Sequence, residues 1–161
     1  MRWPRFAVLV LITILIQASF IDVIGVTSSR ITPDLLLILV VFFATRCEIS
    51  EVIISSFAIG LAADLIPTGF RMGPWILSFG IFGTGLAYIQ GVISLKKMPQ
   101  QAMAIFIAGV GTGILSHILA GHPGGLKLII GTAAYSAVIG PFLSLLLDLI
   151  MPIKRTQRNR R

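Results

Sequence analysis

The feature that most constrains this chain is a succession of long apolar segments, interrupted only by short polar turns. Hydrophobic residues make up 56% of the 161 residues and charged residues 12%, whereas soluble domains contain about 25% charged residues. A helix rises about 1.5 Å per residue, so about 20 apolar residues cross the hydrocarbon core of a bilayer, which is about 30 Å thick. The sequence therefore predicts an all-α, polytopic membrane protein, and its length suits a single domain.

Six apolar segments are separated by turns that contain proline, glycine or charged residues. We expect a six-helix transmembrane bundle in one domain, residues 1–153, followed by a basic tail, residues 154–161. The predicted helices cover residues 4–26, 33–45, 50–66, 74–94, 99–120 and 126–150. Arg2 and Arg5 precede the first segment as in a secretory signal, but this segment is long enough to span, so we interpret it as an uncleaved helix.

The second segment is short for a membrane span. As a helix, residues 33–45 extend over about 20 Å, because the following Arg46-Cys47-Glu48 is polar. Three explanations are open: the bilayer is locally thinner, neighbouring helices shield the segment, or the segment is re-entrant.

Basic residues are distributed unevenly over the turns. If all six segments cross, three of the 13 Lys and Arg residues lie on one side, namely Arg30, Arg71 and Lys127, and the other ten lie opposite. Because basic loops stay in the cytoplasm, both termini are predicted to be cytoplasmic, and the count favours a real second span. The tail, residues 154–161, is expected to lie against anionic membrane lipids and not to bind nucleic acid.

The chain lacks the residue patterns of common enzymes and metal sites. The single Cys47 excludes an internal disulfide and a cysteine-based zinc site. Two histidines, His117 and His122, are too few for a metal site without acidic partners at fixed spacing. There is no Walker loop, HExxH motif or catalytic triad motif. We therefore predict neither an enzyme nor a bound metal or cofactor.

Two of the six acidic residues lie at the edges of strongly apolar segments. Asp34 follows Pro33, which suits the first position of a helix, so Asp34 is expected just inside the helix start. The helix dipole favours an acid there, with Thr32 as a possible cap, and a contact to a partner protein or a neighbouring cation is the alternative. Asp64 lies near the C-terminal end of the third predicted helix, where the dipole disfavours an acid. Capping of its own helix cannot explain Asp64, which therefore needs a partner.

The expected partner of Asp64 is a cation or the start of another helix on the predicted outer side. We define the outer polar cluster by the residues of that side: Asp22, Arg30, Asp34, Asp64 and Arg71. Two interpretations stay open, a structural network of ion pairs or a site that binds a partner or ligand. The cluster has no nucleophile beside a base, so it suits binding and not catalysis.

Four residues are expected to serve helix packing, namely Pro33, Gly60, Gly109 and Gly113. Gly109 and Gly113 form a GxxxG pair that lets helices approach closely, within this chain or against another protein. Gln17, within the first segment, is a candidate for a hydrogen bond between helices. Asp148 is expected to pair with Lys154 or Arg155 near the inner end of the last segment.

Two local patterns, in this order, resemble the rod shape-determining protein MreD family of bacteria. The first is Pro33-Asp34-Leu35-Leu36-Leu37-Ile38-Leu39. The second is Gly60-Leu61-Ala62-Ala63-Asp64-Leu65, followed by a turn and by Gly73-Pro74. Family members similarly open the second helix with a Pro-Asp-Leu-rich segment and close the third with a Gly-Leu-x-x-Asp pattern. The turn departs from the family at Arg71 and Met72, where a smaller and more apolar sequence is expected.

The resemblance implies a non-enzymatic inner-membrane component of the cell-elongation machinery, with a role in rod shape and in the regulation of peptidoglycan synthesis. Such proteins bind the bitopic protein MreC, and they act with RodA, an elongation transpeptidase and, indirectly, MreB filaments. The family is also similar in fold to the six-helix substrate-binding subunits of energy-coupling-factor vitamin transporters. A vitamin-binding subunit is therefore the alternative function, and a small pore is a third class.

Overall fold

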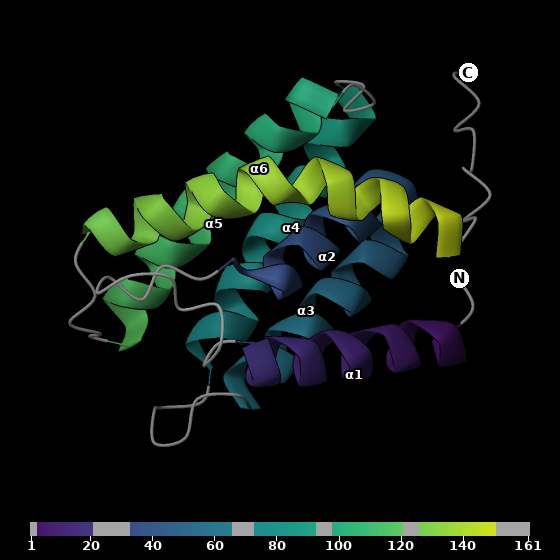
Figure 1. Ribbon diagram of the computed structural model, residues 1–161, viewed down its shortest axis with the longest axis horizontal. Helices are drawn as coiled ribbons and strands as arrows, with labels where there is room; N and C mark the ends of the chain where they lie inside the picture. The colour runs from purple at the N-terminus through teal and green to yellow at the C-terminus, as the bar shows by residue number, and fades with distance from the viewer. Residues whose placement is uncertain (1–2, 21–32, 66–72, 93–97, 121–125, 151–161) are drawn as a thin grey trace.

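The computed structural model is built from α-helices alone within the residues that it describes, which are 3–20, 33–65, 73–92, 98–120 and 126–150. The described residues form six helices, which Figure 1 colours from purple at the N-terminus to yellow at the C-terminus. They are α1 (Trp3–Phe20), α2 (Leu35–Arg46), α3 (Ile49–Leu65), α4 (Pro74–Val92), α5 (Met98–Ala120) and α6 (Leu126–Ile150). The predicted all-α class is confirmed.

Two of the described helices are long and apolar enough to cross a bilayer individually. They contain Met98–Leu119 in α5 and Leu126–Leu149 in α6. Phe6–Ser19 in α1 and Leu35–Arg46 in α2 are apolar but shorter. The helical chain is thus compatible with a membrane protein and has two candidate spans. The predicted end of the first span, residues 21–26, and the basic tail lie outside the described residues.

α2 is the central helix of the bundle. Its residues 36–45 are all buried, and it packs against each of the other five helices. A helix that is apolar on every side is stable only where every side is covered by apolar surroundings. Because α2 meets protein all round, its length does not have to match the thickness of a bilayer. Shielding by neighbouring helices is therefore the explanation that agrees with the structure.

The other helices surround α2 as two packed pairs and a single helix. α3 packs along α4, α5 packs along α6, and all four of these helices also contact α2. α1 packs against α2 and α3. In Figure 1 the start of α1 and the end of α6 lie at the same end of the bundle, on the right.

The glycine pair of α5 serves packing inside this chain. A Cβ atom added at Gly109 would lie 2.9 Å from a methyl carbon of Leu37 in α2 and 3.0 Å from the Cβ atom of Ala133 in α6. A Cβ atom added at Gly113 would lie 2.4 Å from a methyl carbon of Ile129, also in α6. Both glycines therefore allow α5 to approach its neighbours in the same bundle.

The outer surface is apolar, while many interior positions are polar. Large hydrophobic side chains are exposed on α1, α3, α4, α5 and α6. Buried hydroxyls bond within their own helices: the Thr112 hydroxyl donates to the carbonyl of Ala108 at 2.8 Å and the Ser78 hydroxyl to that of Pro74 at 2.7 Å. Soluble monomers rarely expose contiguous apolar patches larger than a few hundred Å². An apolar surface on five helices favours apolar surroundings, such as lipid.

Val40 and Val138 offer a matched test of the central position of α2, because Val40 is 2% exposed and Val138 is 66% exposed. Val40→Ala removes enclosed packing, so we expect it to lower the free energy of unfolding by about 1–3 kcal/mol. Val138→Ala removes the same groups from the outer surface and should change this free energy by less than about 0.5 kcal/mol. Denaturation in detergent, followed by circular dichroism, measures both values. Equal losses would contradict the buried position of α2.

Candidate functional site

The structure describes two of the five residues of the outer polar cluster. Asp34 and Asp64 are described, while Asp22, Arg30 and Arg71 lie outside the described residues. Each of the two acids accepts hydrogen bonds from backbone N–H groups at the start of a helix. Asp34 serves its own helix, α2, whereas Asp64 of α3 serves α4.

Asp34 is the N-cap of α2. Its backbone is extended, with φ −90° and ψ 94°, and its carboxylate accepts a hydrogen bond from the N–H of Leu37 at 3.0 Å. This geometry starts the helix at Leu35, so the predicted start at Pro33 is wrong by two residues. Pro33 precedes the cap and does not occupy the first helical position. The cap fixes the boundary because its side chain replaces the missing acceptor of the first turn.

Two further side chains complete the start of α2, and we call Gln17, Asp34 and Ser136 the α2 cap cluster. The amide oxygen of Gln17 accepts from the N–H groups of Leu35 at 3.0 Å and of Leu36 at 3.3 Å. The hydroxyl of Ser136 in α6 accepts from the N–H of Asp34 at 2.8 Å. Four successive N–H groups, at positions 34–37, therefore have side-chain acceptors from three parts of the chain.

The α2 cap cluster was only partly visible in the sequence. Gln17 was expected to form a hydrogen bond between helices because a polar amide is rare in an apolar segment. Ser136 was missed, since nothing distinguishes it from the other serines of the apolar segments. Without acceptors, each N–H in an apolar surrounding would cost several kcal/mol. The cluster therefore stabilises the buried start of the central helix.

Asp64 caps a neighbouring helix and not its own. Its carboxylate accepts hydrogen bonds from the N–H groups of Gly73 at 3.0 Å, Ile76 at 3.1 Å and Trp75 at 3.2 Å. Pro74 has no N–H, so these bonds serve the unpaired donors at the start of α4. The carboxylate also lies at the positive end of the α4 dipole. The start of another helix is one of the two kinds of partner that the sequence predicts for Asp64, and the structure identifies it as α4.

Gly60 makes this contact possible. It lies four residues before Asp64, hence on the same face of α3. A Cβ atom added at Gly60 would lie 2.7 Å from the Cα atom of Ile76 and 2.9 Å from the carbonyl oxygen of Trp75. These are backbone atoms, which cannot rotate away as a side chain can. Gly60 and Asp64 therefore act together, the first through close approach of α4 and the second through its capping bonds.

A second set of polar contacts lies at the C-terminal end of α2. Arg46 forms an ion pair with Asp148 of α6 and lies 5.1 Å above the ring of Phe42. Its side chain is only 8% exposed. Asp148 pairs with Arg46, while the expected partners Lys154 and Arg155 lie outside the described residues. The two paired residues are 102 positions apart in the chain. The local sequence around either residue therefore does not predict the pair.

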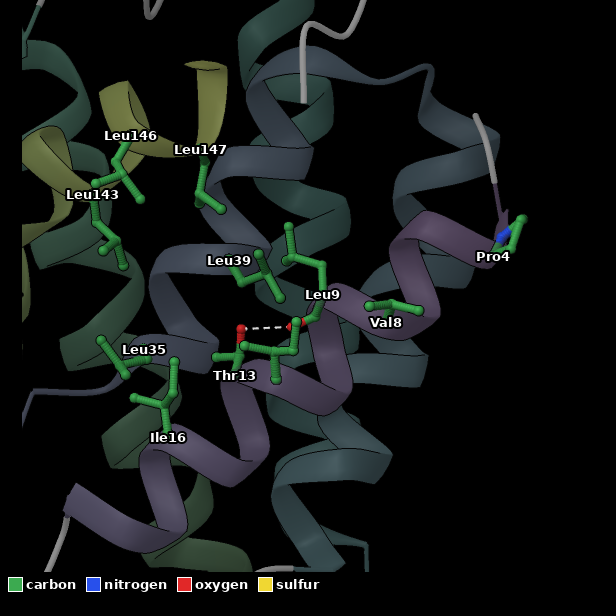
Figure 2. A pocket seen from close by; sticks show the side chains of 11 residues that line it. Pro4, Val8, Leu9, Thr13, Ile16, Leu35, Leu39, Leu143, Leu146 and Leu147 are labelled. Atoms are coloured by element: carbon green, nitrogen blue, oxygen red, sulfur yellow. Dashed lines mark hydrogen bonds between the residues drawn. The ribbon is translucent and has the colours of Figure 1, made fainter. Parts of the chain in front are cut away.

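A lateral groove of about 610 Å³ lies between α1 and α6, with α2 as its floor. Figure 2 shows the leucines of α6 facing the side chains of α1 across this space. Among the eleven described residues that line it, Thr13 has the only polar side chain. The Thr13 hydroxyl donates to the carbonyl of Leu9 at 2.8 Å. The groove therefore presents hydrocarbon to its surroundings.

Comparisons of the chain with protein-family models, with curated proteins and with solved structures return no match. Within the described part of the chain, no group of three or more His, Cys, Asp or Glu residues could hold a metal ion.

Replacement of Asp64 tests its role as the cap of α4. Asp64→Ala removes the two oxygens that accept hydrogen bonds from three part-buried N–H groups, so we expect the free energy of unfolding to fall by about 2–4 kcal/mol. Asp64→Asn retains one carbonyl acceptor without the charge and should give an intermediate loss. The matched control is Glu48→Gln, because Glu48 is exposed at the opposite end of α3. Denaturation in detergent measures all three, and an Asp64→Ala variant as stable as the control would contradict the capping role.

Proposed function

We propose that this chain is a non-enzymatic scaffold of the bacterial inner membrane, in which all six helices cross the bilayer and hold a bitopic partner protein. The observation that supports the proposal is that Asp34 and Asp64 both cap the starts of helices. In an apolar chain, both acids accept hydrogen bonds from backbone N–H groups at helix starts. These bonds hold helices in position, which is the task of a scaffold. A catalytic acid or base would need its proton site free for a substrate.

Several features support six membrane crossings. Exposed hydrophobic side chains occur on five helices, and the sixth, α2, is enclosed by protein. The start of α1 and the end of α6 lie at the same end of the bundle (Figure 1), as an even number of crossings requires. The ten basic residues of that side then face the cytoplasm.

The resemblance to the MreD family supplies the proposed partner. In this proposal an MreC-like bitopic membrane protein binds the scaffold, which then acts with RodA and the elongation transpeptidase and, indirectly, with MreB filaments. Asp34 and Asp64 act by fixing the starts of α2 and α4 at the proposed outer face. A partner that meets this face needs both helix starts in fixed positions, because ordering them upon binding would weaken the affinity.

A vitamin-binding subunit of an energy-coupling-factor transporter is the alternative. Binding sites for polar small molecules are mainly apolar but contain a few free polar groups that orient the ligand. The groove between α1 and α6 offers no such group, since the Thr13 hydroxyl is already bonded to Leu9. No observation on the described residues favours the transporter.

The topology can be measured with single cysteines in a Cys47→Ser background. Burial raises the pKa of the native Cys47 thiol to about 11, so it reacts slowly even before replacement. We expect Thr68→Cys to react with an impermeant maleimide in right-side-out membrane vesicles. Ser94→Cys and Thr156→Cys should react only in inside-out vesicles. Labelling of Thr156→Cys and Thr68→Cys from the same side would contradict six crossings with cytoplasmic termini.

Partner binding can be measured by co-purification with a tagged MreC-like protein from the same cell. We expect Asp34→Asn and Asp64→Asn to lower the recovered partner about five-fold or more, which corresponds to about 1 kcal/mol of binding free energy. Glu48→Gln, at the proposed inner side, should leave recovery unchanged. Size-exclusion chromatography first selects variants that remain folded. Full recovery of the partner by both folded Asp variants would contradict the scaffold role of these residues.

A further inference from the structure

A small cavity lies inside the bundle, where the C-terminal half of α2 meets α5 and α6. Every residue that lines it is buried, with exposed fractions between 1% and 8%. Four of these residues are apolar, and the other three are Thr45, Gln101 and Ser144. The cavity leaves about 10 Å³ for the centre of a water molecule. A buried water needs about 10–15 Å³ on this measure, so the space fits one water molecule and no larger ligand.

The three polar side chains of the cavity can form further hydrogen bonds. The Thr45 hydroxyl donates its hydrogen to the carbonyl of Phe42 at 2.9 Å. The single hydrogen of the Ser144 hydroxyl has two acceptors, the amide oxygen of Gln101 at 3.1 Å and the carbonyl of Pro141 at 2.8 Å. Each hydroxyl can therefore only accept a further bond. The amide nitrogen of Gln101 can only donate, and it donates to none of the residues that the structure describes.

Water is the ligand that matches these groups. It can accept a bond from the amide nitrogen of Gln101 and donate its two hydrogens to the hydroxyl oxygens of Thr45 and Ser144. Three hydrogen bonds are the usual number for a buried water. A methyl group in the same space would leave the N–H groups of Gln101 without an acceptor, and a metal cation would face these N–H groups. An unpaired polar group is costly in apolar surroundings, where no solvent replaces its partner.

We propose that one water molecule is bound between α2, α5 and α6, where it accepts from the amide nitrogen of Gln101 and donates to the hydroxyls of Thr45 and Ser144. The water joins the three helices close to the ion pair of Arg46 with Asp148, because Thr45 directly precedes Arg46. The α2 cap cluster ties the start of the central helix to its neighbours, and the water ties its C-terminal half. This proposal concerns the interior of the bundle and is independent of the bitopic partner.

Nuclear Overhauser effects between water and methyl groups, measured by NMR on the full chain in detergent micelles, test the proposal. We expect cross-peaks from water to the methyl groups of Val41 and Ile105, which line the cavity. The control is Val52, which is 0% exposed and does not line the cavity. Its carbonyl accepts from the Ser55 hydroxyl at 3.0 Å, so Val52 also reports what exchange of a buried hydroxyl contributes. Cross-peaks to Val41 and Ile105 no stronger than those to Val52 would overturn the proposal.

Two variants of similar side-chain volume test which groups hold the water. Gln101→Leu removes the donor and should lower the intensity of the Ile105 cross-peak at least five-fold, while Thr45→Val removes one acceptor and should lower it at least two-fold. The matched control is Thr112→Val, because Thr112 is a buried threonine whose hydroxyl also donates within its own helix but does not line the cavity. It should leave the cross-peak unchanged. An undiminished cross-peak in either folded cavity variant overturns the bond assigned to that side chain.

Discussion

Acceptors for the N–H groups at buried helix starts are the constraint on which this structure depends. The first N–H groups of a helix have no partner within the helix, and in an apolar surrounding water does not supply one. At α2 the acceptors come from Gln17, Asp34 and Ser136, and at α4 they come from Asp64. Because these side chains belong largely to other helices, the bonds that satisfy the backbone also hold α1 and α6 against α2 and α3 against α4.

The central position of α2 follows from the same contacts. Its start is tied to α1 and α6 by the α2 cap cluster, and its end is tied to α6 by the ion pair between Arg46 and Asp148. Between these ends every residue is buried. A helix of 12 residues can lie in a bilayer in this way, because its own polar ends are satisfied by protein and its sides never meet lipid.

The capping acids and the apolar groove are two chemically different features of one bundle. Asp34 and Asp64 are committed to the starts of α2 and α4. In the proposed function they act through the positions of these two helices. The groove has no free polar group and suits only hydrocarbon. Both meet at α2, since Leu35 lines the groove and directly follows Asp34. The groove and the α2 cap cluster therefore share the central helix.

The sequence by itself determined that the chain is helical, because apolar segments between short polar turns allow few other folds. It also determined that Asp64 needs a partner, since an acid at the C-terminal end of a helix opposes the dipole. Only the tertiary structure decided that this partner is the start of α4, that Ser136 completes the α2 cap cluster, and that Asp148 pairs with Arg46. These pairings join residues up to 102 positions apart. They depend on which helices lie side by side, and hydropathy, which is local, contains no information about that arrangement.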